Sequence, residues 1–217
     1  MKNALVLSAA LGITCTVAAI LLAVANAKTY AARAEAKVAE REEALRLVLP
    51  EFDNSPSADT CKVELKPEGE TVEFFRARRG GKLVGLAARA GAKGYGGRVE
   101  VLAGCAPDGK IVKLIVLAHS ETPGLGTQVT DRTAQKTLGD LLRGRKDADA
   151  AAATLPPSAY LDQYEKFSLS DTPEFKVARD GGKVDAVTGA TISSRAVARA
   201  MTLVAKAFQE QRAQITQ

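Results

Sequence analysis

The stretch Asp185-Ala-Val-Thr-Gly-Ala-Thr-Ile-Ser-Ser-Arg195 lies near the C-terminus and marks a change from extended to helical sequence. Val187 ends a strand-forming run, and Gly189 and Ala190 form a small-residue hinge. An amphipathic helical pattern begins just after Thr191, so we expect this residue at a strand-to-helix corner. The first turn of a helix has unpartnered backbone N–H groups and the positive end of the helix dipole, so such corners bind anions. We therefore expect the Thr191 hydroxyl to lie where a phosphate group can be bound or attached.

The same residues also allow a plainer interpretation. Ser and Thr are preferred N-cap residues, and Gly often marks a turn. In that case Thr188-Gly-Ala-Thr191 only caps a helix, and the chain is a cofactor-free, membrane-tethered adaptor. The residues of this stretch alone leave both interpretations open.

Two more segments add to the first and carry a resemblance to a known family. The run from Asp185 to Thr191 resembles the flavinylation motif of the FMN-binding domain shared by Rnf-type and Na-pumping NADH:quinone oxidoreductase complexes. Glu121-Thr-Pro-Gly-Leu-Gly126 resembles the loop that lines the flavin site in that family, and Gly94-Tyr-Gly-Gly97 is similar to the approach to that loop. Length and the residues after Thr188 look more like the G subunit of the Rnf-type ferredoxin:NAD oxidoreductase than the C subunit of the Na-pumping enzyme, which stays the alternative.

The resemblance implies that Thr191 carries FMN through a phosphoester, which a separate flavin transferase would attach. It implies an electron-relay subunit of an ion-translocating complex, acting with the other subunits and not turning over alone. Lys183 and Arg195 flank the motif and are expected to offset the phosphodiester charge. No residue is assigned a catalytic role. The remaining cofactor-binding residues that the resemblance implies are Asp185, Thr188, Gly189, Ala190, Glu121, Thr122, Gly124, Leu125 and Gly126.

Side chains around the second motif have less certain roles. Glu121 either caps its own loop or accepts a hydrogen bond near the flavin ring. His119 is interpreted as structural or solvated, and contact with the flavin is the alternative. Gly124 and Gly126 are expected to let the backbone close against the ring. Tyr95 either stacks on the flavin or packs in the fold.

The N-terminus predicts a membrane anchor. No charged residue occurs from Asn3 to Ala27, and this apolar run exceeds the roughly 20 residues that span a bilayer. Ala25-Asn26-Ala27 would suit signal-peptide cleavage, but the run is longer than a signal core, so we favour a retained anchor. Flanking charges do not decide the orientation. Signal-anchor logic and the resemblance place a single-pass protein in the inner (cytoplasmic) membrane, with its domain on the periplasmic side.

Composition excludes several other classes of protein. The 217 residues carry a formal charge of +5 with scattered Lys and Arg, which does not suit nucleic-acid binding. There is no Rossmann fingerprint, P-loop or CxxC pair, so we expect neither a nucleotide site of those kinds nor a metal site. Of three cysteines, Cys61 is expected in a polar loop and Cys105 on the inner side of a strand; whether they pair stays open.

Patterning predicts an α+β fold, an antiparallel sheet with packed helices. We expect an anchor at residues 1–27, a juxtamembrane helix at 28–50 and an FMN-binding domain at 51–217. Within these, the expected elements are a helix at Tyr30–Leu49, strands at Thr71–Arg79, Leu83–Arg89, Val99–Cys105 and Ile111–Ala118, a helix at Thr133–Arg143, a low-complexity connection at Ala150–Ala159, a short strand pair within Phe175–Val187, and a final helix with Val197, Met201, Val204 and Phe208 on one stripe.

Overall fold

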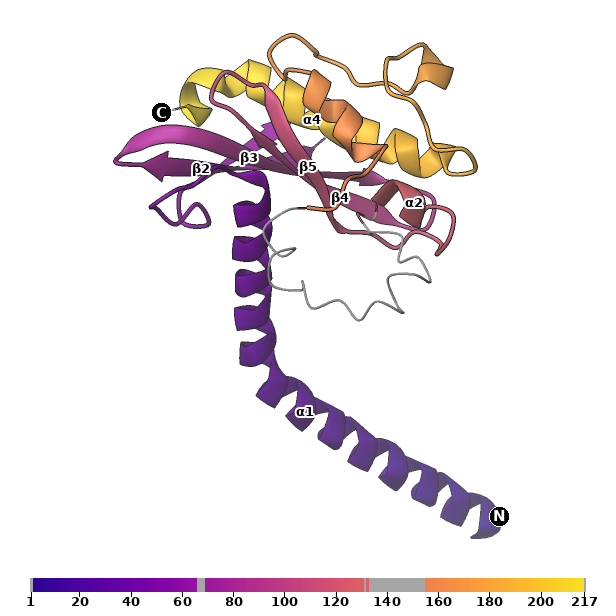
Figure 1. Ribbon diagram of the computed structural model, residues 1–217. Coiled ribbons are helices and arrows are strands. Elements are labelled where there is room, and N and C mark those ends of the chain that lie inside the picture. The colour runs from indigo at the N-terminus through magenta and orange to yellow at the C-terminus, as the bar shows by residue number, and fades with distance from the viewer. Residues whose placement is uncertain (1, 66–68, 131, 133–154, 217) are drawn as a thin grey trace, which may run out of the picture. The chain divides into compact units, whose positions relative to one another are not determined.

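A computed structural model describes residues 2–65, 69–130, 132 and 155–216 of the chain (Figure 1). It divides into two compact units, Met1–Glu42 and Glu43–Gln217, which are described separately. The helix expected at Thr133–Arg143 lies outside the described residues, as does the first half of the connection expected at Ala150–Ala159.

The first unit is formed by helix α1, Lys2–Val48, whose last turns belong to the second unit. Its segment Ala10–Tyr30 has a mean hydropathy of 2.0 and is long and apolar enough to cross a membrane. Hydroxyl groups within this segment bond to the helix itself; Thr16 donates to the Gly12 carbonyl at 2.8 Å. Such internal bonds lower the cost of placing a hydroxyl in lipid. The expected juxtamembrane helix is the continuation of α1, not a separate element.

The second unit is built on a five-stranded antiparallel sheet in the sequential order β1-β2-β3-β4-β5. The four expected strands are confirmed, and a further edge strand precedes them. Gly80 and Gly81, with φ of 58° and 77°, form the two-residue turn between the second and third strands. The strands are β1 Thr60–Leu65, β2 Glu70–Arg79, β3 Lys82–Lys93, β4 Arg98–Cys105 and β5 Ile111–Ala118.

Both faces of the sheet are covered, because successive side chains in a strand point to opposite faces. Phe74 and Leu86 point toward helix α4, Thr191–Ile215, whose buried stripe includes Met201 and Phe208. The neighbouring Phe75, with Ala87, Leu102 and Ile115, packs against Leu45 and Val48 at the end of α1. Figure 1 shows this end of α1 meeting the sheet. A side chain at Gly104 would overlap the Val48 carbonyl, so this helix end lies directly on the sheet. The stripe expected for the final helix is confirmed, because Val197, Met201, Val204 and Phe208 are all buried.

The segment before α4 differs from the expected strand pair. The prediction of strands within Phe175–Val187 was wrong, since the only pairing there is a single parallel bridge between Val177 and Val184. Between these residues the chain makes a 3-10 turn, η3, Ala178–Asp180, followed by Gly181 at φ 80°. The backbone groups bond locally within this turn, so no ladder forms. A second 3-10 helix, η2, spans Leu161–Lys166, and a one-turn helix, α2, spans Thr127–Thr130.

The structure corrects the expectation for the cysteines. Cys61 lies buried on β1 and not in a polar loop, while Cys105 is buried on β4 as expected. Strands β2 and β3 separate them, and strands lie about 4.8 Å apart, so the sulfur atoms cannot bond. Both are free thiols. Burial raises the pKa of the Cys105 thiol to about 12, so it stays protonated and unreactive.

A charged cluster fixes the far end of α4 to the sheet. The Arg76 guanidinium donates to the carbonyls of Gln214 at 2.7 Å and Ile215 at 2.9 Å, and to Asp59 at 2.8 Å. Arg78 donates to the second Asp59 oxygen at 2.9 Å. Partial burial alone would raise the pKa of Asp59, but these hydrogen bonds from Arg78 and Arg76 outweigh it and lower the pKa. The carboxylate thus holds the two arginines that orient the helix end.

Replacing Asp59 with Asn should therefore reduce stability in a pH-dependent way. The folded pKa lies below the usual 3.8, so the stabilising contribution is fully present above that value and is lost as the pH falls through the folded pKa. We expect the difference in unfolding free energy between wild type and Asp59→Asn to shrink below about pH 4 in urea titrations. A difference that stays constant from about pH 6 to about pH 3 would contradict this assignment.

Candidate functional site

Thr191 is the first residue of α4, and the start of this helix lacks a side-chain cap. The N-cap residue is Ala190, which makes no side-chain hydrogen bond. The first helical bond runs from the Ser194 N–H to the Ala190 carbonyl at 2.9 Å. Among the described residues, the N–H groups of Thr191, Ile192 and Ser193 have no acceptor. Neither Thr188 nor Thr191 therefore caps the helix through its side chain, as the plainer interpretation required.

The chain enters this helix through a tight turn and not from a strand. Gly189 adopts φ 82°, which only glycine adopts readily, and the Ala190 N–H closes the turn on the Val187 carbonyl at 3.0 Å. The Ser194 hydroxyl accepts from the Val187 N–H at 3.2 Å and holds the turn against the helix. Tyr160 donates to the Ser194 carbonyl at 2.8 Å. These bonds fix the direction in which Thr191 leaves the turn.

A buried carboxylate joins the three sequence segments that carried the resemblance. Glu121 is 5% exposed, and one of its oxygens accepts from the N–H groups of Tyr95 at 3.0 Å and Gly96 at 3.4 Å. The other oxygen accepts from the Ser193 hydroxyl at 2.6 Å. Since both oxygens are bonded to protein donors, these contacts favour the loop-capping role for Glu121. His119 accepts from the Glu121 N–H through Nδ1 at 3.3 Å, which suits its structural interpretation.

Two glycines make room for this carboxylate. A Cβ atom at Gly94 would overlap a Glu121 carboxylate oxygen, and one at Gly126 would lie 2.6 Å from the other. Gly126 thus closes on Glu121, whereas Gly124 has φ 78° and open space around it. From the sequence, Gly124 and Gly126 were both expected to let the backbone close against the flavin ring. In the structure only Gly126 lies against Glu121.

A cavity of 410 Å³ opens beside Thr191. Its rim includes three exposed apolar side chains, Tyr95 at 71%, Leu125 at 55% and Ile192 at 48% exposure. In the described part of Glu43–Gln217 only Val112 is a comparably exposed large apolar residue. Clustering of this kind marks a ligand or protein contact, because scattered exposure would be the norm. The lining residues are Tyr95, Glu121, Thr122, Leu125, Gly126, Arg179, Gly189, Ala190, Thr191, Ile192 and Ser193.

The cation nearest Thr191 is one that the sequence did not indicate. Arg179 lines the cavity, and its Nη1 donates to the Thr191 hydroxyl oxygen at 3.4 Å. Arg195, by contrast, is bound to Asp180 through contacts of 2.7 and 2.6 Å, and Lys183 does not line the cavity. Hydrogen bonding with Arg195 lowers the pKa of the Asp180 carboxyl, so the pair stays ionised. Of these three cations, only Arg179 lines the cavity and contacts the Thr191 hydroxyl.

The remaining expected residues lie around the cavity without lining it. Asp185, Thr188 and Gly124 are absent from its walls. The backbone of Asp185 is held by the Gln163 side chain, which accepts from its N–H at 2.8 Å. Asp185 itself is exposed.

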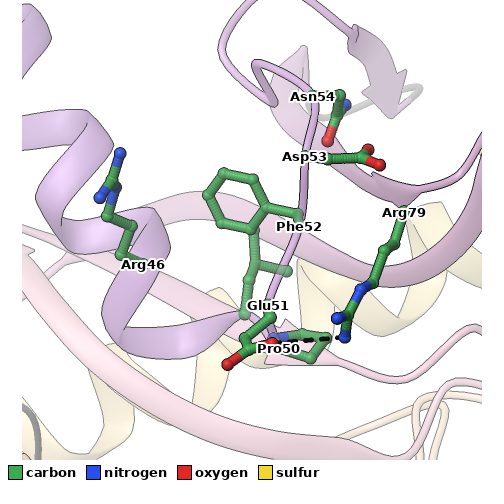
Figure 2. Close-up of a pocket in the computed structure, with 8 residues that line it drawn as sticks. Arg46, Pro50, Glu51, Phe52, Asp53, Asn54 and Arg79 are labelled. Carbon is green, nitrogen blue, oxygen red and sulfur yellow. Dashed lines mark ion pairs between the residues drawn. The ribbon is translucent and has the colours of Figure 1, made fainter.

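A larger hollow of 630 Å³ lies on the sheet face covered by the end of α1. Figure 2 shows the Phe52 ring and Pro50 in its wall and the ion pair of Glu51 with Arg79, at 3.3 Å. Asp53 accepts from the Gly80 N–H at 2.7 Å and so supports the β2–β3 turn. These contacts explain the hollow as the junction between a loop and a hairpin.

Comparisons of the sequence with known proteins converge on one family. Residues 94–206 match the FMN-binding domain, a range that contains all three segments singled out from the sequence. A relative from Stutzerimonas stutzeri, described as the G subunit of an ion-translocating oxidoreductase complex, is 31% identical over 87% of this chain and 74% of its own. One with the same description from Cereibacter sphaeroides is 34% identical over 86% and 76%. A Clostridium ljungdahlii relative, described as the G subunit of a proton-translocating ferredoxin:NAD(+) oxidoreductase complex, is 28% identical over 87% and 83%. Among solved structures, Shewanella oneidensis NqrC is similar at a TM-score of 0.46 and 22% identity, over 77% of this chain and 69% of that one.

Removing the Ser193 hydroxyl should loosen the site. In Ser193→Ala a buried carboxylate oxygen loses its donor, which costs about 1–3 kcal/mol of unfolding free energy. Amide exchange at Tyr95 and Gly96, whose N–H groups bond to the same carboxylate, should become faster. Ser170→Ala is the matched control, because its hydroxyl bonds to the Asp108 carbonyl at an exposed position. Equal effects of the two variants would contradict the role given to Ser193.

Proposed function

This chain belongs to the family of G subunits of ion-translocating oxidoreductase complexes, whose FMN-binding domain it carries, and we propose that it is an electron-relay subunit with FMN esterified to Thr191. The observation that carries this proposal is the position of the Thr191 hydroxyl. It lies at an uncapped helix start and opens into a cavity walled by both family motifs. A phosphate attached there would meet the free N–H groups of the first turn and the positive end of the α4 dipole.

The residues present suit a flavin in both its parts. The helix start offers N–H donors for the phosphate end, and the exposed apolar rim of Tyr95, Leu125 and Ile192 suits the ring end. When bound, FMN supplies reversible one- and two-electron chemistry that the side chains of the protein lack. The protein's own part is to hold that group in a fixed orientation, through the Glu121 network, while its rim stays open to redox partners.

Attachment changes only the Thr191 side chain. The Thr191 oxygen would attack the flavin phosphate of a phosphoanhydride donor, such as a flavin dinucleotide. The anhydride P–O bond breaks, the second phosphate leaves with its electron pair, the hydroxyl proton passes to a base of the transferase, and the chain gains the mass of FMN less water. No base lies within hydrogen-bond distance of the Thr191 hydroxyl among the described residues. We therefore infer that a separate flavin transferase activates this hydroxyl. Because the linkage runs through the phosphate, the ring keeps its own electronic properties.

The build of the cavity supports a relay role. Its walls contain one carboxylate, Glu121, and both oxygens of that group are bonded to the protein. General acid–base catalysis would need a free acid or base, whereas electron transfer needs only proximity to another redox centre. We propose that these centres lie in other subunits of the same membrane complex and that the chain does not turn over alone.

Replacing Thr191 with Ala should abolish covalent flavin and leave the fold near wild type. The chain would be co-expressed with a flavin transferase, and its intact mass and fluorescence after denaturation measured. Wild type and Thr191→Ser should both gain FMN less water, because each retains a hydroxyl at this position. Thr191 is not the helix cap, so the unfolding free energy of Thr191→Ala should change by less than about 1 kcal/mol. Covalent flavin on Thr191→Ala would refute the site.

Reporter fusions test the proposed periplasmic location. Alkaline phosphatase fused after residue 217 should be active and a cytoplasmic fluorescent protein fused there should be dark, since each folds only in its own compartment. A truncated chain that begins at residue 43 lacks the apolar segment Ala10–Tyr30 and should reverse both results. An active fluorescent fusion of the full chain would place the domain in the cytoplasm.

A further inference from the structure

Arg179 occupies a rigid position opposite the Thr191 hydroxyl. It lies in η3, where the Ala178 N–H bonds to the Val184 carbonyl at 2.7 Å and the Asp180 N–H to the Val177 carbonyl at 2.8 Å. Asp180, the next residue, bonds to Arg195 of α4 through both carboxylate oxygens. This second contact fastens the turn to the helix that begins with Thr191.

Two cations beside this turn are paired with carboxylates. Lys176 pairs with Glu174 at 2.9 Å, and Arg195 pairs with Asp180 at 2.6 Å. Within the described part of the chain, neither Arg179 nor Lys183 has a carboxylate within ion-pair distance, and of these two only Arg179 lines the cavity. The Arg179 guanidinium donates instead to the Thr191 hydroxyl, inside the cavity. A guanidinium that has no acid of its own and points at a neutral hydroxyl is placed to receive an anion at that hydroxyl.

We propose that Arg179 binds the phosphate group of the flavin at Thr191, and that the Asp180–Arg195 pair positions it for that contact. The inference rests on the proposed function for the identity of the ligand. The phosphate would accept from the guanidinium on one side and from the N–H groups of the α4 start on the other. Two independent sets of donors would thus converge on the group that is joined to Thr191.

This arrangement predicts that the phosphate is recognised before any covalent bond exists. The unmodified full-length chain, made in detergent without a flavin transferase, should bind FMN more tightly than riboflavin, which lacks only the phosphate. The ratio of the two dissociation constants, measured by flavin fluorescence, isolates phosphate recognition from ring binding. Damage to the fold would weaken both ligands and leave the ratio unchanged.

Three variants separate the roles of the turn's charges. In Arg179→Gln the preference for FMN should fall by roughly tenfold or more, as expected for loss of a charge-assisted hydrogen bond. Arg179→Lys should keep part of it, because an ammonium group is a single point charge. Asp180→Asn should show an intermediate loss, since it retains the binding guanidinium and weakens its placement. Lys183→Gln is the matched control and should leave the ratio unchanged, because Lys183 does not line the cavity.

Some outcomes would overturn the proposal. Equal affinity of the wild type for FMN and riboflavin, or no measurable FMN binding, would show that the unmodified site does not recognise phosphate. An unchanged ratio in Arg179→Gln would assign the preference to the helix start alone. The proposed function fails by a different measurement, because a wild-type chain that gains no FMN mass on Thr191 beside an active transferase would refute covalent attachment whatever this ratio is.

Discussion

The buried carboxylate of Glu121 is the interaction on which the rest of the site depends. It bonds to Gly96, 25 residues away in the chain, and to Ser193, 72 residues away. Removing a carboxylate from water costs several kcal/mol, so the group is tolerated only because its donors surround it. The absence of side chains at Gly94 and Gly126 follows from that packing. Gly94 and Gly126 are therefore explained by a carboxylate that supports the site from inside.

How much of this the sequence could predict depends on how local the signal is. The start of α4 at Thr191 and four of the strands were predictable because hydrophobic period and turn residues are local, whereas the polar flanks of β1 resemble a loop. Val177 and Val184 have strand-forming character, yet the chain between them closes into a 3-10 turn. That turn brings Arg179 to the cavity, where a regular hairpin would have directed it along the sheet. The sequence did not indicate that Arg179 belongs to the site, because tertiary contacts bring it beside Thr191.

An apolar rim around the cavity bears on why the cofactor would be tethered. Tyr95, Leu125 and Ile192 are all more than one third exposed, so the cavity is open toward solvent on this side. An open site suits electron exchange with other subunits, but it buries little ligand surface and so holds a ligand weakly. In the proposed periplasmic location, a flavin lost from such a site would not be replaced. A covalent bond to Thr191 would permit the site to be both open and permanently loaded.

The uncapped start of α4 distinguishes this proposal from a cofactor-free adaptor. A Ser, Thr, Asp or Asn at the N-cap would contribute about 0.5–2 kcal/mol, yet the position is Ala190, buried at 5% exposure. The nearby Ser193 and Ser194 hydroxyls bond elsewhere, to Glu121 and to the preceding turn. An adaptor gains nothing from leaving these N–H groups without acceptors beside an arginine that has no carboxylate partner among the described residues. A phosphate on Thr191 would supply the acceptor that the helix and Arg179 both lack, so one group accounts for two otherwise unrelated features.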